Sequence, residues 1–356
     1  LILIIDFKLK KNLFYPRVRK ETPDPRISLR LQRSEYGADF RLKKIDLDSF
    51  YPDTTKLLKS LSKFHGVRED SILVGLGAES LIKDIFIWFS RKYKSKKILN
   101  IIPNYFMYTF FSKVFDIKEY NLFYNPSGKN ISSKLIIETL KKDNIKLLIL
   151  VNPSSPFERN WSIKEIITIL NFSKKNNIIV LLDEVYQLMG SKSASALIKK
   201  FSNLLILRSF SKGFGFPGIR SGYILTNKNL IKEIETYRLA IELPSDTIEK
   251  SIYLLNNFKK IVKKRIQFII EARKFAHQQL KKRGFKSFNH FSNSVSFKFS
   301  NEKEKNKICE GLQKSNILIN YKYQKPLNCY ANITTTNKNN IVLFLKKLDL
   351  LTKKNG

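Results

Sequence analysis

Three apolar runs in the middle of the chain each lead into a polar residue, and this repeat constrains the fold more than any other feature. One run ends at Val151 just before Asn152, the next ends at Leu182 just before Asp183, and the third precedes Lys212. The polar residues are 31 and 29 positions apart (152 to 183, then 183 to 212). Short apolar runs separated by helical patterns predict a largely parallel sheet, in which ligands bind at the carboxyl ends of the strands. The sequence therefore predicts an α/β fold with these three residues at one edge of its sheet.

The segment that contains the lysine, SFSKGFGFPGIRSGY from Ser209 to Tyr223, has the donors of a phosphate site. Hydroxyls at Ser209 and Ser211, backbone N–H groups in a glycine-rich turn and the guanidinium of Arg220 are the groups that a dianionic phosphate requires. Lys212 lies among them and can form an imine with a carbonyl group of the same ligand. A lone lysine beside glycines is most often a surface residue in a loop. The order of the whole segment favours a binding site instead.

This segment resembles the lysine motif S-x-S-K-x-x-G-x-x-G-x-R-x-G-Y of the class I and II aminotransferases, fold-type I enzymes that use pyridoxal 5'-phosphate (PLP). Within these enzymes, the segment resembles that of histidinol-phosphate aminotransferase and its relative threonine-phosphate decarboxylase. The resemblance implies the PLP-dependent transferase fold, in which helices flank a mixed, mostly parallel sheet and a smaller α+β domain follows. It implies an N-terminal arm over 1–40, a large PLP-binding domain over 41–235, and a small C-terminal domain with an interdomain helix over 236–356.

The resemblance also implies which contact each matching residue makes with the cofactor ring. Lys212 would hold PLP as a Schiff base and move protons, and Asp183 would pair with the pyridine nitrogen. Asn152 and Tyr186 would donate to the phenolic oxygen of the ring. Tyr105, in the stretch IPNYFMY, matches a tyrosine that lies flat on the ring.

A second set of residues is implied to bind the cofactor phosphate. A short apolar strand from Ile72 leads through a glycine turn into a helix, and such a turn presents free N–H groups to an anion. The implied phosphate ligands are Gly77, Ala78, Glu79, Ser209, Ser211, Arg220 and Tyr51. Tyr51 would reach the site of the opposite subunit, so the resemblance implies a homodimer. Alternatively, Tyr51 is an aromatic residue at the edge of a turn with no such role.

Two segments on the substrate side depart from the family pattern. RSEYG keeps Glu35 and Tyr36 of a longer string, and CYANITTTNKNN has Asn332 at the position of an arginine that grips a substrate carboxylate in the family. Loss of a charged hydrogen bond costs about 1.5–3 kcal/mol. Either another basic residue, such as Arg33 or Lys322, takes over this role, or the substrate is not gripped in this way.

The remaining pattern predicts the elements around these motifs. Amphipathic periodicity predicts helices over 54–66, 134–143 and 162–175, and a β-rich stretch extends to residue 124. Long lysine-rich helices are predicted between 231 and 283, one of them a spine between the domains. Alternating apolar and polar residues predict strands within 285–299 and 317–334, and a last helix begins near 339.

The composition is strongly basic, with a formal net charge of +36 over 356 residues. Such a charge is typical of nucleic-acid binding. Here, however, the lysines are spread in pairs from Lys10 to Lys354 without a compact basic arm. We therefore expect no nucleic-acid partner. We interpret the charge as a compositional bias of a chain rich in lysine, asparagine, isoleucine and phenylalanine, with attraction of an anionic substrate or partner as the alternative.

The spacing of the cysteines and histidines and the hydropathy of the chain argue against a disulfide-rich protein, a metal site and a membrane protein. Cys309 and Cys329 make no CxxC pair or disulfide framework, which is typical of a reducing compartment and predicts a cytoplasmic protein. The histidines, His65, His277 and His290, are too scattered to suggest a metal site. No apolar run approaches the roughly 18–20 residues of a transmembrane helix, and the first residues do not have the pattern of a signal peptide. We therefore expect neither a metal nor a membrane.

The leading hypothesis is a PLP-dependent aminotransferase acting on a small, phosphorylated amine, ketone or amino acid. A decarboxylase of phosphoserine or phosphothreonine on the same scaffold is the alternative, because the bond that breaks depends on its angle to the cofactor ring. A PLP-binding regulator is a distant alternative, since we expect no room for a helix-turn-helix domain before Leu1 or after Gly356.

Overall fold

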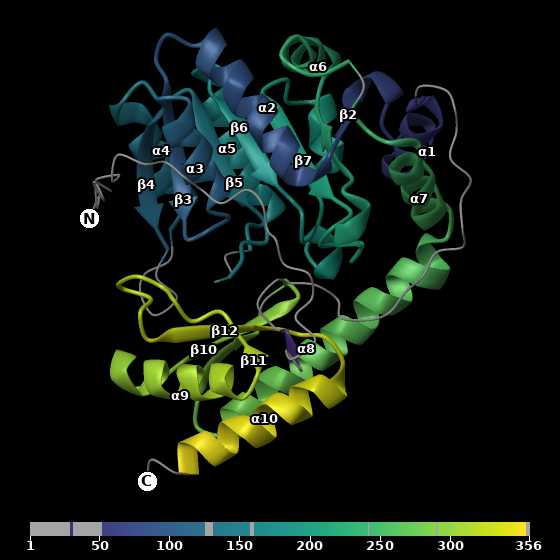
Figure 1. The fold of residues 1–356 in the computed structure, drawn as a ribbon. Helices are drawn as coiled ribbons and strands as arrows, with labels where there is room; N and C mark the ends of the chain where they lie inside the picture. The colour runs from purple at the N-terminus through teal and green to yellow at the C-terminus, as the bar shows by residue number, and fades with distance from the viewer. Residues whose placement is uncertain are drawn as a thin grey trace.

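The main feature of the fold is a seven-stranded sheet, shown in a computed structural model that describes residues 29–30, 52–124, 131–156, 160–240, 242–289 and 291–353 (Figure 1). The strand order is β2-β8-β7-β6-β5-β3-β4. The strands are β2 (Ile72–Gly75), β3 (Lys97–Ile102), β4 (Lys118–Phe123), β5 (Leu147–Val151), β6 (Ile179–Asp183), β7 (Leu204–Ser209) and β8 (Gly222–Leu225). All neighbours are parallel except at β8, which is antiparallel to β2 and β7. The predicted mixed, mostly parallel sheet is confirmed.

Helices cover both faces of this sheet because its central strands are apolar on both sides. Every residue of β5 and β6 is buried, which is the pattern of strands inside a parallel sheet. One face packs on α2 (Gly77–Lys92), α3 (Met107–Val114) and α6 (Lys228–Glu235). The other face packs on α1 (Thr55–His65), α4 (Ser133–Lys142), α5 (Ile163–Lys175) and α7 (Ser245–Asn256). Short helical turns complete this part of the chain: η1 (Glu69–Ser71), η2 (Gln187–Met189), η3 (Ser195–Lys199) and η4 (Pro217–Ile219).

Local sequence signals set several helix ends. Ser162 and Glu165 form a capping box at the start of α5, in which each side chain bonds to the backbone N–H of the other. Gly66 ends α1 in the left-handed conformation, with φ of 64°. The predicted helices over 54–66, 134–143 and 162–175 are confirmed. The β-rich prediction up to residue 124 is wrong in part, because α3 occupies 107–114 before β4 begins.

A second, smaller sheet lies below the first in the view of Figure 1. It is antiparallel, in the order β12-β10-β9, and α9 (Glu302–Lys314) and α10 (Lys338–Lys353) pack on it. Its strands are β9 (Lys286–Asn289), β10 (Ser294–Lys298) and β12 (Tyr330–Thr334), and β11 (Ile317–Leu318) pairs separately with β1 (Leu29–Arg30). The predicted smaller α+β part is confirmed. The domain boundaries near residues 40 and 235 stay predictions.

One long helix joins the two parts. α8 (Lys264–Lys282) follows a π-helical segment, η5 (Phe258–Lys263), and runs from the large sheet to the small one (Figure 1). Its first half buries Ile266 and Ile269 in the core of the large part. Its second half buries Ala276 and Leu280 in the core of the small part. α8 is therefore the spine that the sequence predicts.

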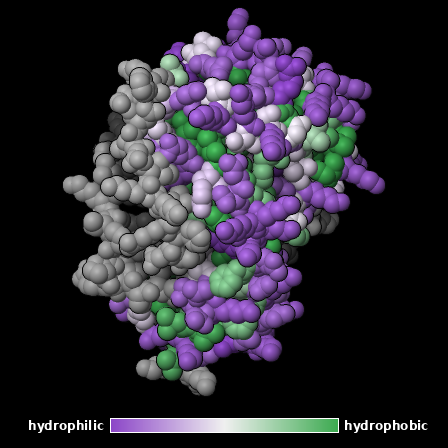
Figure 2. Space-filling view, turned by 90° about the vertical axis from the view of Figure 1, so that its right-hand side faces the viewer, coloured by the Kyte–Doolittle hydropathy of each residue, from purple (hydrophilic) through white to green (hydrophobic). Residues whose placement is uncertain are grey.

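The surface is mainly hydrophilic on the face drawn in Figure 2, where hydrophobic residues lie in scattered patches. This is the surface expected for a chain in which charged residues make up 27% of the sequence. Within the described residues, no helix combines the length and the apolar character that crossing a membrane requires.

A half-buried histidine at the end of α1 links this helix to β8. His65 Nε2 lies 2.9 Å from Tyr223 Oη. Burial, together with the positive charge of Arg208, lowers the pKa of His65 to about 3. In the unfolded chain this imidazole takes up a proton near pH 6.5, whereas in the folded protein it stays neutral. The contribution of His65 to stability is therefore lost as the pH falls below about 6.5.

We expect the free energy of unfolding of the wild-type protein to fall, relative to that of His65→Gln, by about 1–2 kcal/mol between pH 8 and pH 5. Urea unfolding of both proteins at the two pH values measures this difference. A difference that does not change with pH would show that His65 is not held neutral in the folded state.

Candidate active site

The predicted site residues lie along one edge of the large sheet. Asp183 ends β6 and is in register with Val151, the last residue of β5, while Ser209 ends β7 and is in register with Gly222 of β8. Two backbone hydrogen bonds then join the loops that follow these strands. The N–H of Asn152 donates to the carbonyl of Asp183 (2.7 Å), and the N–H of Gly213 donates to the carbonyl of Val185 (3.0 Å). Backbone hydrogen bonds therefore connect the strand-end segments that carry Asn152, Asp183 and Lys212.

Asp183 is the buried charge of this edge, with 3% of its surface exposed. Burial raises its pKa to about 6, although Oδ2 accepts a 2.6 Å hydrogen bond from Tyr108 Oη and Oδ1 accepts one from the N–H of Val185 (3.0 Å). A carboxylate has about four lone-pair sites, so two donors leave room for a third. Asp183 is thus an ionised group at neutral pH that a nearby cation would stabilise.

Tyr108 is a site residue that the sequence reasoning missed. It is the second tyrosine of the stretch IPNYFMY, three residues after Tyr105 and in the first turn of α3, and this repeat of tyrosine was the signal that could have found it. Tyr105 itself is 39% exposed, and its Oη donates to Glu79 Oε2 (2.9 Å) in the first turn of α2. The two tyrosine rings stand edge to face, with centroids 6.5 Å apart. Tyr105 therefore borders the site, and Tyr108 orients the Asp183 carboxylate through its hydrogen bond.

Asn152 closes the loop that follows β5. Its Oδ1 accepts from the N–H of Trp161 (2.8 Å), and its Nδ2 donates to the carbonyl of Trp161 (3.3 Å). The fully buried amide thus joins the two described parts of this segment, 152–156 and 160–161, which are here together called the 152–161 loop. The amide carries a second hydrogen. One donor for a ligand oxygen is therefore compatible with this arrangement.

The other end of the edge has the donors of a phosphate site. A Cβ on Gly222 would lie 2.7 Å from the carbonyl carbon of Gly77 and 2.9 Å from the N of Ala78, so β8 runs directly against the first turn of α2. A Cβ on Gly77 would lie 3.1 Å from Arg220 Nη2, which places the guanidinium across the same turn. Free N–H groups of a helix N-terminus beside a guanidinium form an anion site. The first turn of α2 and the Arg220 guanidinium therefore fit a phosphate group.

Gly222 is therefore expected to tolerate no side chain. We expect Gly222→Ala to lower the free energy of unfolding by about 1–3 kcal/mol, because the new methyl group meets backbone rather than a flexible side chain. Affinity for PLP should fall by about tenfold or more, since a shift of β8 moves Arg220 away from α2. Thermal unfolding and a PLP titration measure the two effects. Gly218→Ala is the matched control, because a Cβ there meets nothing within 4 Å; equal behaviour of the two variants would contradict the close approach.

Ser209, Ser211, Lys212 and Tyr186 complete the edge. Both serines are buried, and Ser209 Oγ accepts from the N–H of Ser211 (3.0 Å). Lys212 is half-buried and stands immediately before the Gly213 bond to the β6 loop. Tyr186 is buried and precedes η2. The described edge thus holds an amine, a carboxylate and phosphate donors in one row.

Three of the predicted residues, Glu35, Tyr36 and Tyr51, lie outside the described residues. Asn332 lies in the small sheet, on β12, with 3% of its surface exposed. Its Nδ2 donates to Ser296 Oγ (2.9 Å) and Ser294 Oγ (3.2 Å) on β10.

A buried ion pair behind the edge was also missed. Arg208 of β7 donates to the Glu184 carboxylate (2.5 Å), and the N–H of Ala194 donates to the same carboxylate (2.7 Å). Glu184 follows Asp183 directly, so the two neighbouring carboxylates have different partners. The signal was the adjacent acidic pair at a strand end. The pair binds the β6 and β7 strands to the loop that follows η2.

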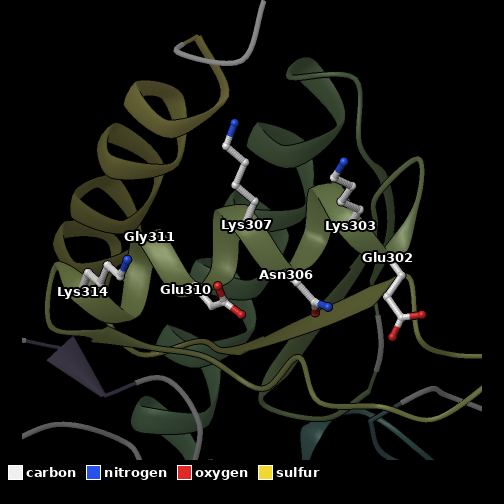
Figure 3. Close-up of a pocket in the computed structure, with 7 residues that line it drawn as sticks. All are labelled: Glu302, Lys303, Asn306, Lys307, Glu310, Gly311 and Lys314. Carbon is white, nitrogen blue, oxygen red and sulfur yellow. The ribbon is translucent and has the colours of Figure 1, made fainter.

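A shallow surface depression of about 760 Å³ lies elsewhere, along α9 (Figure 3). Lysine and glutamate side chains project from a single helix around it (Figure 3). The lining residues are Glu302, Lys303, Asn306, Lys307, Glu310, Gly311 and Lys314. None of the predicted site residues lines it, so it is not the candidate active site.

A phosphate cradle, an amine and a buried carboxylate, in this order along the edge of a mostly parallel sheet, define a PLP-dependent enzyme of fold type I. Comparison with known proteins agrees. The family model described as aminotransferase class I and II matches residues 14–327. The chain therefore belongs to the class I and II aminotransferases. It is a PLP-dependent aminotransferase, and pyridoxal 5'-phosphate is its cofactor.

Several individual relatives of the chain are histidinol-phosphate aminotransferases. The chain is 31% identical over 300 residues to a histidinol-phosphate aminotransferase from Buchnera aphidicola, covering 81% of this chain and 82% of the relative. It is 27% identical to one from Ruminiclostridium cellulolyticum over 83% and 82% of the two chains. The structure of the Sinorhizobium meliloti enzyme in complex with PLP superimposes with a TM-score of 0.81 at 17% identity, over 93% and 92% of the chains. A threonine-phosphate decarboxylase from Porphyromonas gingivalis gives 0.73 at 20% identity, over 91% and 99%.

Proposed function

We propose that the substrate of this aminotransferase is a small phosphorylated amine or its ketone, as the name of the histidinol-phosphate relatives suggests. The order of the site residues along the sheet edge supports binding of the cofactor: the phosphate donors lie at β2 and β8, the lysine follows β7, and the carboxylate ends β6. The relatives that share this branch at 27–31% identity support the same substrate class.

When bound, PLP supplies an electron-withdrawing ring that stabilises negative charge on the carbon beside the substrate nitrogen. The amine of Lys212 would take the proton from the substrate Cα and later return a proton, as general base and acid. Asp183, oriented by Tyr108, would neutralise the protonated ring nitrogen. Asn152 and Tyr186 would donate to the phenolic oxygen.

At the other end, Arg220, Ser209, Ser211 and the first turn of α2 (Gly77, Ala78 and Glu79) would hold the phosphate. Anchoring the phosphate at β2 and β8 would keep the ring over Asp183 and within reach of Lys212. Tyr105 would cover the ring from the side of α3. Glu35, Tyr36 and Asn332 are proposed to lie on the substrate side.

We also propose a cytoplasmic homodimer in which Tyr51 reaches the phosphate of the opposite subunit. The two free cysteines, Cys309 and Cys329, suit a reducing compartment. The molecular mass in solution tests the dimer, which would have twice the 41.7 kDa of the chain.

The test of the proposed function is the visible absorption spectrum of the PLP-loaded protein with amino donors. We expect L-glutamate to reduce the band near the violet edge and a band of the aminated cofactor to rise, and a phosphorylated ketone should then reverse the change. If glutamate has no effect but histidinol phosphate does, another amino donor serves. If no amine changes the spectrum while carbon dioxide is released from phosphothreonine, the enzyme is a decarboxylase instead.

A further inference from the structure

A hydrogen-bond relay, with its two side chains buried, joins the small sheet to the active-site edge of the large one. Asn332 Nδ2 donates to Ser296 Oγ (2.9 Å), and Ser296 Oγ donates to the carbonyl oxygen of Pro156 (2.6 Å). Ser296 and Pro156 are 140 residues apart in the sequence. Pro156 belongs to the 152–161 loop, whose first residue is Asn152. The relay therefore connects the small part of the molecule to a loop of the candidate active site.

The relay has one direction. The Pro156 carbonyl can only accept, so the single hydrogen of the Ser296 hydroxyl is committed to it. A lone pair of Ser296 then accepts from the Asn332 amide, which can only donate through Nδ2. Both side chains are buried, with 0% and 3% of their surface exposed. A buried polar relay of this kind is costly to interrupt, because any group left without its partner keeps its desolvation penalty.

The backbone around Asn332 holds the relay in place. Asn332 is paired with Ser296 in the β10–β12 register, and on its other side it exchanges two backbone hydrogen bonds with Asn320 (3.0 and 2.7 Å). Strand β10 therefore lies on one side of Asn332, and the isolated β-bridge to Asn320 lies on the other. Asn332 is thus fixed within the small sheet and can anchor the loop.

A separate contact keeps the two parts together. Two aromatic side chains from the end of β4 pack against residues of the small part, in a cluster made of Phe123, Tyr124, Phe288, Tyr323, Leu327 and Tyr330. Because this cluster does not include the relay, removal of the Ser296 hydroxyl should release the loop without separating the two parts.

We propose that Ser296, oriented by Asn332, is a positioning residue that holds the 152–161 loop, and with it Asn152, in its place against the small sheet. The role of Asn152 toward the cofactor rests on the proposed function, but the anchoring of the loop does not. In this arrangement Asn332 acts on the reaction through Ser296 and Pro156.

Hydrogen–deuterium exchange of the PLP-loaded protein tests the proposal. We expect Ser296→Ala to speed exchange in peptides spanning 152–161 by about 2- to 10-fold, the effect of losing one hydrogen bond. Peptides of α2 should exchange as in the wild-type protein. Ser294→Ala is the matched control: Ser294 accepts from Asn332 and lies on the same strand, but the relay to Pro156 runs through Ser296. Ser296→Thr keeps the hydroxyl and should restore slow exchange.

Steady-state kinetics of the same variants separate positioning from general stability. A loop released next to the cofactor should lower kcat in Ser296→Ala more than in Ser294→Ala, at similar melting temperatures. Equal exchange of the 152–161 loop in Ser296→Ala and Ser294→Ala would overturn the proposal, as would faster exchange throughout the molecule. If the wild-type protein fails to transaminate but the loop still loosens only in Ser296→Ala, the proposed function fails and the anchoring role stands.

Discussion

Replacement of Lys212 by alanine is expected to abolish turnover, by at least about 10⁴-fold, together with the visible absorption band of the covalently held cofactor. The amine of Lys212 is the only group in the described row of site residues that can form an imine with a carbonyl and also transfer a proton. The fold should be retained, because the loop that contains Lys212 is held by backbone hydrogen bonds. One example is the bond that the Gly213 N–H donates to the Val185 carbonyl. The spectrum and the turnover rate of the purified variant measure both effects.

Borohydride reduction provides an independent readout for Lys212. Treatment of the PLP-loaded wild-type protein should fix the cofactor mass on the peptide that contains Lys212, as shown by mass spectrometry. Lys199→Ala is the control, because Lys199 is an exposed lysine at the end of η3. Retained turnover in Lys212→Ala, or cofactor fixed on another lysine, would show that the site is assigned to the wrong residue.

Replacement of Asp183 by asparagine is expected to have opposite effects on activity and on the stability of the cofactor-free protein. The amide cannot neutralise a protonated ring nitrogen, and an unpaired buried charge costs about 3–5 kcal/mol, which corresponds to a loss of roughly 10²- to 10⁴-fold in rate. The cofactor-free protein should instead become more stable at pH 7.5. Burial raises the pKa of Asp183 from 3.8 to about 6, so ionisation of this group costs the folded state about 2–3 kcal/mol.

The sign of this effect follows from proton binding. The folded protein holds the Asp183 proton more tightly than the unfolded chain does, so the wild-type protein loses stability as the pH rises from about 4 to 6. Asp183→Asn has no such group and should not show this loss. Urea unfolding of the cofactor-free proteins at pH 4.5 and 7.5 measures it, with the exposed Asp116→Asn as a control. If Asp183→Asn keeps full activity, another group serves the ring nitrogen.

Local patterns in the sequence predicted the large sheet and the position of its functional edge. Apolar runs that end at Val151 and Leu182 gave β5 and β6, and the polar residues after them lie at neighbouring strand ends because consecutive parallel strands present the same edge. The capping box at Ser162 likewise marks the start of α5 within the chain itself. The roles of Lys212, Asp183 and Asn152 toward PLP stay predictions that the variants above test.

Other features depended on contacts between distant residues. The stretch from Met107 to Val114 is rich in aromatic residues and suits a strand, yet it forms α3 because Met107, Tyr108 and Phe111 bury one helical face in the core beside α2. Helix formation there turns Tyr108 toward Asp183, 75 residues away. Strand propensity alone could not have placed that hydroxyl.

The sequence by itself determined the class of fold, the strand ends that carry the site and the order of the site residues, because periodicity and turn residues act over a few neighbouring positions. Only the tertiary structure decided the partners of those residues. The Tyr108 bond to Asp183, the close approach of Gly222 to Gly77 and the Ser296 bond to Pro156 each join residues from separate elements. Their geometry depends on the register of strands and the rotation of helices in the packed core, which no local pattern specifies.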